Sequence, residues 1–143
     1  MIDMLAMGQQ ILASQPFSVF LGAQLTAFND EQVELHLPLR DELKQQNGFA
    51  HGGVLSYLAD NALTFAGGAR LGPAVLTAEY KINMLNPAHG EKLVARARVI
   101  KHGKTLVITQ CDVFAVKDGR ESLCATMLQT LMVMRGVADS RRA

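Results

Sequence analysis

Apolar and polar residues follow two different repeats in the first third of this chain. In the segment DEQVELHLPL, Val33, Leu35 and Leu37 alternate with polar residues, which indicates a strand with one buried face. Residues 3–14 instead carry apolar side chains at helical spacing, and Pro16 is expected to end that helix. The chain therefore begins with a helix followed by a half-buried strand.

A second helix is predicted in the segment QNGFAHGGVLSYLADNALTFAGG. We expect it to cover residues 52–66 and to end at Gly67 and Gly68, because glycine commonly terminates helices. Its residues are apolar on nearly every side. Such a helix is expected to be wrapped by other elements rather than laid on a surface.

Strand-like alternation dominates the rest of the chain. It covers four runs, residues 75–85, 92–99, 105–116 and 121–134. The segments NPAHGE, KHGK and KDGR between them have turn composition, and short turns imply antiparallel pairing, here as a meander of three or four strands. The sequence thus predicts an α+β fold in which a curved antiparallel sheet wraps around a long central helix. We expect one domain over residues 1–143, with a helix within 1–15 and a flexible tail at 135–143.

Composition restricts the class of protein. The chain has 143 residues, of which 49% are hydrophobic and 19% charged, so a stable core is expected. A net charge of +1 argues against a nucleic-acid partner. No segment is long and apolar enough to span a membrane, and Asp3 stands where a signal peptide would be basic. Cys111 and Cys124 are not spaced as metal ligands, so we expect a cytoplasmic protein with no metal and no cofactor.

One acid interrupts the most apolar helix. Ser56, Asp60 and Thr64 are spaced four residues apart and form a narrow polar stripe on it. The stripe either faces solvent or lines a cleft or a subunit interface, and its narrowness favours the latter. In a cleft, Asp60 would attack an acyl carbonyl or activate a water that does, and Thr64 would position that water.

The start of the same helix offers backbone donors. Gly52 and Gly53 stand at a helix N-terminus, where unpaired N–H groups and the helix dipole favour negative charge. Glycines let a ligand approach closely, so this end suits an oxyanion hole for an acyl carbonyl, although a simple turn explains the pair as well. His51 is either a hydrogen-bonding structural residue or a base.

These residues resemble a known family. The segment HGGVLSYLADNALTFAGG is similar to the signature of acyl-CoA thioesterases with the hotdog fold, in the phenylacetyl-CoA thioesterase-like branch. The resemblance continues through NPAHGEKLVARARVIKHGKTLVITQCDVF and covers roughly residues 20–134. It implies hydrolysis of an acyl-CoA, for which the apolar residues around the helix suggest an apolar or aromatic acyl group.

The resemblance also implies roles for individual residues. Asp60 would be the nucleophile or general base, and the N–H of Gly53 would polarise the thioester carbonyl. Gln45 would orient the thioester or the water, with Asn47 as a second candidate two residues out of register. Thr64 and Thr77 match positions at which members of the family use a hydroxyl group. The Gly103–Lys104 turn matches a place where members contact the phosphates of CoA.

The spacing of Gly53 and Asp60 bears on whether one chain can form the whole site. Seven helical residues separate them by about 10 Å, too far for both to touch one carbonyl. In hotdog dimers two central helices run antiparallel, so the resemblance implies a homodimer, or a tetramer of two dimers, with sites at the subunit interface. The alternatives are a hotdog acyl-thioester hydratase and a hotdog protein that binds acyl-CoA or lipid without turnover.

Overall fold

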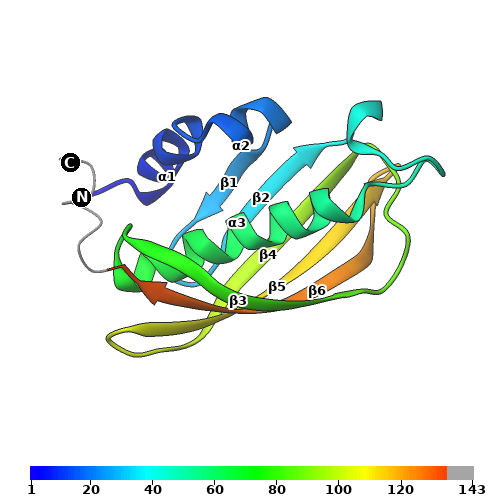
Figure 1. The fold of residues 1–143 in the computed structure, drawn as a ribbon. Coiled ribbons are helices and arrows are strands. Elements are labelled where there is room, and N and C mark those ends of the chain that lie inside the picture. The colour runs from blue at the N-terminus through cyan, green and yellow to red at the C-terminus, as the bar shows by residue number, and fades with distance from the viewer. Residues whose placement is uncertain (135–143) are drawn as a thin grey trace.

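A six-stranded antiparallel sheet curls around one long helix in the computed structural model, which describes residues 1–134 (Figure 1). The strands are β1 Gln24–Phe28, β2 Val33–Pro38, β3 Val75–Met84, β4 Lys92–His102, β5 Leu106–Lys117 and β6 Arg120–Val133. Their order in the sheet is β1-β2-β4-β5-β6-β3. Helix α3, Gly52–Leu71, lies along the concave face, which confirms the predicted hotdog architecture. The tail predicted at 135–143 lies outside the described residues.

The core forms where α3 meets the sheet. Leu58, Ala62 and Leu63 are fully buried on the helix, and Leu35, Leu93 and Val113 are fully buried on the strands. Because sheet side chains alternate between faces, the polar residues of β2 point away from α3. Burial of this apolar helix against five strands stabilises the curvature of the sheet.

The end of α3 differs from the prediction. The helix passes through Gly67 and Gly68 to Leu71, and Gly72, at φ 90°, terminates it with an N–H bond to the Gly68 carbonyl. Gly67 is needed for close packing instead, since an added Cβ would lie 2.5 Å from Leu131 Cδ1 and 3.0 Å from Val107 Cγ1. Gly67 therefore marks a close helix–sheet contact and not a helix end.

The N-terminal segment contains two elements that the hydrophobic pattern did not predict. Helix α1, Met4–Ala13, is confirmed, and Asp3 caps it by accepting a bond from the Ala6 N–H. Pro16 then begins a second helix, α2 Pro16–Leu21, a position where its missing N–H costs nothing. Strand β1 follows directly. Both elements are only five or six residues long, too short for a clear period.

The predicted meander is correct only for its last three strands. Strands β4, β5 and β6 pair in sequence order, but β3 pairs with β6 and not with β4. The segment NPAHGE therefore crosses the end of the sheet instead of closing a hairpin. This places β3 at one edge of the sheet, next to β6.

A β-bulge in β3 changes which side chains face α3. Simple alternation predicts that Leu76 points inward and Thr77 outward. The ladder with β6 shifts between Thr77 and Glu79, so Thr77 and Tyr80 share the inner face. Leu76 is consequently 55% exposed.

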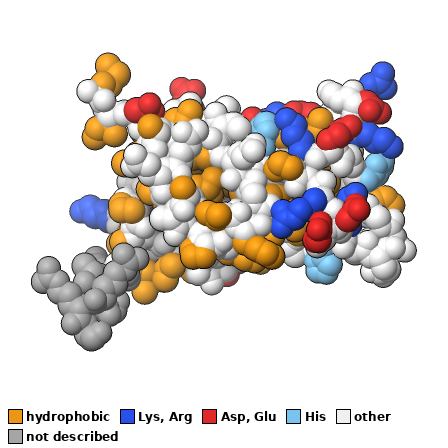
Figure 2. Space-filling model, turned by 90° about the horizontal axis from the view of Figure 1, so that it is seen from above, with side chains coloured by type: hydrophobic (Ala, Val, Ile, Leu, Met, Phe, Trp, Pro, Cys, Tyr) orange, Lys and Arg blue, Asp and Glu red, His pale blue; other side chains and the backbone are white. Residues whose placement is uncertain are grey.

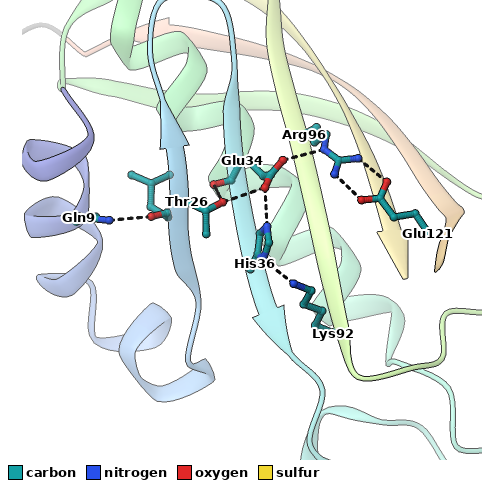
Figure 3. Close-up of polar contacts among 8 residues, drawn as sticks. Gln9, Thr26, Glu34, His36, Lys92, Arg96 and Glu121 are labelled. Atoms are coloured by element: carbon teal, nitrogen blue, oxygen red, sulfur yellow. Dashed lines mark hydrogen bonds and ion pairs between the residues drawn. The ribbon is translucent and has the colours of Figure 1, made fainter. Parts of the chain in front are cut away.

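The outer face of the sheet carries a polar network, shown in Figure 3. Arg96 on β4 donates to Glu34 on β2 at 2.8 Å and, with both terminal nitrogens, to Glu121 at the start of β6. His36 lies between Glu34 and Lys92. Burial alone would raise the pKa of Glu34, but hydrogen bonds from Arg96, His36 and Thr26 outweigh it and lower that pKa. The network therefore ties together strands that are not neighbours in sequence.

Surface character is divided along the molecule. Figure 2 shows apolar side chains over the part that carries α1 and α2, and charged side chains gathered toward the opposite end. Phe17, Val19 and Phe20 of α2 are exposed. No helix within residues 1–134 is long and apolar enough to cross a membrane.

Candidate active site

Asp60 is held by two strands of the sheet. Its side chain is half-buried on α3, and Oδ1 accepts a hydrogen bond from Thr77 Oγ1 at 2.7 Å and another from Gln129 Nε2. These bonds compensate the cost of placing a carboxylate in an apolar helix. Oδ2 has no hydrogen-bond partner among residues 1–134. The carboxylate is thus fixed through one oxygen and free at the other.

The Asp60 partner on β6 was missed by the sequence analysis. Gln129 is fully buried, and its Oε1 has no partner in the described part of the chain. Leaving such an acceptor unpaired costs about 1–3 kcal/mol. A signal was available, since Met127, Gln129 and Leu131 alternate on the inner face of a strand and the glutamine is the polar exception.

Thr64 lies one helical turn beyond Asp60. Its hydroxyl donates to the Asp60 carbonyl at 2.8 Å, a common bond of threonine within helices. Its oxygen retains the capacity to accept a bond. Thr64 also lines a cavity of about 710 Å³ between α1 and α3. Most of the other lining residues are apolar, among them Met4, Met7, Ile11, Phe28, Phe65 and Val75.

The apolar pocket is therefore built by α1 as well as by α3. The sequence analysis took the apolar residues along the central helix as a general indication of an apolar ligand. Leu58 and Leu63 are instead core residues, whereas Phe65 lines the cavity. Asn61 and Gln15 are among the polar residues that line the cavity, and Asn61 Nδ2 donates to Gln15 Oε1 at 3.1 Å.

The N-terminus of α3 presents one free backbone donor. The N–H of Gly53 is donated to His51 Nδ1 at 2.9 Å, so His51 caps the helix and carries its proton on Nε2. The N–H of Gly52 has no acceptor within residues 1–134. Of the two glycines, Gly52 is therefore the one whose donor is available to a ligand, whereas the sequence analysis favoured Gly53.

Gln45 and Asn47 lie beside this helix start. The loop turns back on itself, with the Gln45 N–H bonded to the Phe49 carbonyl and the His51 N–H bonded to the Leu43 carbonyl. Gln45 Oε1 accepts a bond from the Asn47 N–H. The structure thus brings Gln45, Asn47 and His51 to one end of α3.

The Gly103–Lys104 turn lies at the other end of the molecule. It connects β4 and β5, and the neighbouring Val107 packs against Gly67 near the C-terminus of α3. Both turn residues are exposed. Within one chain, the residues predicted for the site therefore fall into three separate groups, at the two ends of α3 and at its middle.

Helix geometry sets the separation between two of these groups. Gly52 and Asp60 are eight residues apart on a continuous helix, which corresponds to about 12 Å. A carbonyl that contacts Asp60 cannot also reach Gly52 of the same chain. The residues predicted for the site are therefore not brought together within one described chain.

Comparison with known proteins agrees with this fold. Residues 47–122 match the thioesterase superfamily. A thioesterase family protein from Silicibacter pomeroyi is 40% identical, with a TM-score of 0.85 over 89% of this chain and 95% of that one. A thioesterase from Haemophilus influenzae is 27% identical, with a TM-score of 0.82 over 96% and 94%.

A more distant structure shares the fold. The PaaI protein from the phenylacetic acid degradation operon of E. coli is 17% identical, with a TM-score of 0.77 over 90% of this chain and 91% of that one. The architecture is that of hotdog proteins. The chain belongs to the thioesterase superfamily, and the prediction of a thioester hydrolase is confirmed.

Proposed function

We propose that this chain hydrolyses acyl-CoA thioesters with an apolar or aromatic acyl group, at sites shared between two subunits. The observation that carries the proposal is the carboxylate of Asp60, which two strands fix on one face of an apolar helix. An oriented carboxylate with one free oxygen is suited to attack on an acyl carbonyl.

Two routes are open to Asp60. In one, the free oxygen removes a proton from a water, which attacks the carbonyl while the CoA thiolate leaves. In the other, that oxygen attacks the carbonyl, the thiolate leaves, and water then hydrolyses the mixed anhydride. In either route Thr64 Oγ1 accepts a hydrogen bond from the water, and Gln45 Nε2 orients the thioester.

The developing negative charge on the carbonyl oxygen requires donors. We assign this role to the Gly52 N–H of the other subunit, which lies at a helix N-terminus and lacks an internal partner. His51 supports it by holding the first turn of the helix and by offering its Nε2–H.

An unprotected sheet edge supports a dimer. Strand β3 pairs only with β6 in the described chain, and its other edge leaves backbone groups unpaired. Tyr80 and Met84 along it are 42% and 49% exposed. The opposite edge, β1, is covered by α1, where Gln9 donates to the Leu25 carbonyl. Antiparallel pairing of two β3 edges, in a dimer or a tetramer of two dimers, would set the two α3 helices antiparallel.

Substrate recognition divides between two regions. The apolar cavity of about 710 Å³ beside Thr64 suits the acyl group. Lys104, exposed on its turn, suits a CoA phosphate. Because Lys104 lies at the end of the molecule opposite Gly52, an antiparallel partner would bring its lysine toward that donor. The two buried cysteines, Cys111 and Cys124, accord with a cytoplasmic location.

Replacement of the carboxylate tests the proposal. Asp60→Asn keeps the shape of the side chain and an oxygen for Thr77, but it removes the nucleophile and base. We expect kcat for thiol release from a panel of short-chain, long-chain and aromatic acyl-CoAs to fall about 10²–10⁴-fold. Ser56→Ala, one turn earlier on the same stripe, is the control and should retain activity.

The outcomes separate the alternatives. Wild-type rates from Asp60→Asn would remove Asp60 from the mechanism. If the wild-type protein binds the acyl-CoAs tightly and releases no thiol, a hotdog protein that binds acyl-CoA or lipid without turnover would be favoured. Hydration of an unsaturated acyl-CoA without thiol release would favour the hydratase. Preference for short polar acyl groups would contradict the role of the cavity.

A further inference from the structure

We propose that Gln129 is a positioning residue that selects which oxygen of Asp60 reacts. The inference rests on the proposed function, because it concerns the same carboxylate. Gln129 is fully buried on β6, and its amide nitrogen donates to Asp60 Oδ1 and, at 3.2 Å, to Thr77 Oγ1. Among residues 1–134 its side-chain hydrogen bonds are made to Asp60 and Thr77, neither of which lines the apolar cavity, so we expect it to act through Asp60.

The chemistry of the neighbours fixes the orientation of the amide. A carboxylate accepts hydrogen bonds and cannot donate them. Thr77 gives its own proton to Asp60 Oδ1, so its oxygen faces Gln129 as an acceptor. Both groups near the amide therefore require a donor, and Nε2 must point toward them. A reversed amide would set Oε1 against the negative charge.

The backbone holds Gln129 in this place. In the sheet it stands between Tyr80 of β3 and Thr109 of β5, so its strand is paired on both sides. Thr77 comes from β3, whose bulge turns it inward. The two donors thus belong to a rigid ladder, whereas the acid belongs to the helix. The sheet fixes the carboxylate against rotation about its terminal torsion, which is otherwise broad.

Both hydrogen bonds end on the same oxygen. Oδ1 is occupied by Thr77 and Gln129, and Oδ2 is free. The reacting oxygen is therefore Oδ2. Oε1 of Gln129 is left without a partner in the described chain, so the glutamine is not placed to satisfy its own hydrogen bonds. Its position is explained by what it does for Asp60.

A purely structural role makes a different prediction. If Gln129 only docks α3 on the sheet, its removal should lower stability and leave turnover per folded molecule unchanged. If it positions Asp60, removal should lower turnover, because orientation at the reacting centre matters most in the transition state. Removal of the unpaired acceptor offsets part of the stability lost with the bond to Asp60, so turnover per folded molecule is the deciding measurement.

Gln129→Met separates these cases, because methionine has a similar length and no hydrogen-bonding groups. We expect kcat to fall about 10- to 100-fold with KM changed less than threefold. Gln129→Leu serves as a second variant if the first does not fold. Thr109→Val is the control, since it removes a buried hydroxyl on the adjacent strand that donates to the Gln129 backbone carbonyl at 3.5 Å but makes no hydrogen bond to the Gln129 amide group or to Asp60.

The double variant Asp60→Asn/Gln129→Met completes the test. If Gln129 acts through Asp60, the double variant should be no slower than Asp60→Asn alone. Equal fold-losses in both backgrounds, or a kcat of Gln129→Met within twofold of wild type, would overturn the inference while Asp60→Asn still tests the proposed function.

A measurement that does not depend on turnover distinguishes failure of this inference from failure of the proposed function. The carbon-13 shift of the Asp60 carboxyl group should move in Gln129→Met and not in Thr109→Val. An unchanged shift would overturn the inference even in a protein that hydrolyses none of the substrates tried.

Discussion

At the scale of single residues, the unusual feature is a set of polar groups with incomplete hydrogen bonding around an apolar helix. Asp60 Oδ2, the Gly52 N–H and Gln129 Oε1 all lack partners within residues 1–134. Native proteins pair nearly all buried polar groups, so Asp60 Oδ2 and the Gly52 N–H are candidates for ligand contact, whereas the fully buried Gln129 Oε1 is explained by the positioning of Asp60. Gln45 and Asn47 are the remaining pair whose roles need to be separated.

We expect Gln45→Ala to lower kcat about 10- to 100-fold and to raise KM by less, because the proposed role of the amide is to orient the reacting thioester. Asn47→Ala should stay near wild type, since its backbone N–H, which contacts Gln45, is kept. Steady-state kinetics of both variants measure this. A silent Gln45 variant with a damaged Asn47 variant would assign the role to Asn47.

At the scale of elements, the contact between α3 and the sheet depends on small residues. Gly67 lets the helix approach Val107 and Leu131, whereas a Cβ at Gly68 would have 3.9 Å to its nearest neighbour, Val75. The two glycines are adjacent in one helix, so they offer a matched comparison of packing with helix propensity.

Gly67→Ala should lower the free energy of unfolding by about 1 kcal/mol, since overpacking of about 1–3 kcal/mol outweighs the helical gain of about 1 kcal/mol. Gly68→Ala should raise it by about 0.5–1 kcal/mol. Denaturant unfolding of both variants measures these changes. Stabilisation by both alanines would show that Leu131 and Val107 repack without cost.

At the scale of the whole molecule, the proposed active site depends on how two chains meet. Gly52 and Asp60 lie about 12 Å apart on one helix, and the β3 edge is open in the described chain. In the proposed isologous dimer, the Gly52 of each chain would lie beside the Asp60 of the other, and each dimer would then hold two composite sites.

Mixing two inactive variants tests the composite site. Asp60→Asn removes the carboxylate, and Gly52→Val obstructs the donor at a position where the backbone has no positive φ. A mixed dimer has one site with both lesions and one with neither. With random exchange about half of the dimers are mixed, so activity should approach about a quarter of wild type.

Subunit exchange must be verified by mass spectrometry, and each variant alone is the baseline. Activity that stays at this baseline after confirmed exchange would mean that each site is built within one chain. Gly52 or Asp60 would then have no role in catalysis.

The sequence by itself determined the elements with strong periods and several candidate residues of the site. The alternation of β2, β4 and β5 and the all-round apolar α3 predict a curved sheet around a helix, because one buried face must meet another. Asp60 is recognisable because a carboxylate is costly in such a helix. These signals are local, so reading them does not require knowing which strands pair.

The tertiary structure decided the pairing and the contacts. That β3 lies beside β6, that its bulge turns Thr77 inward, and that Gln129 reaches Asp60 depend on residues 17 to 69 positions apart. The same holds for Gly67, whose sequence context suggests a helix end but whose neighbours require close packing. Strand order and bulges are set by the total packing free energy of the sheet. No local period encodes that free energy, which is why the partners of Asp60 emerged only in the folded chain.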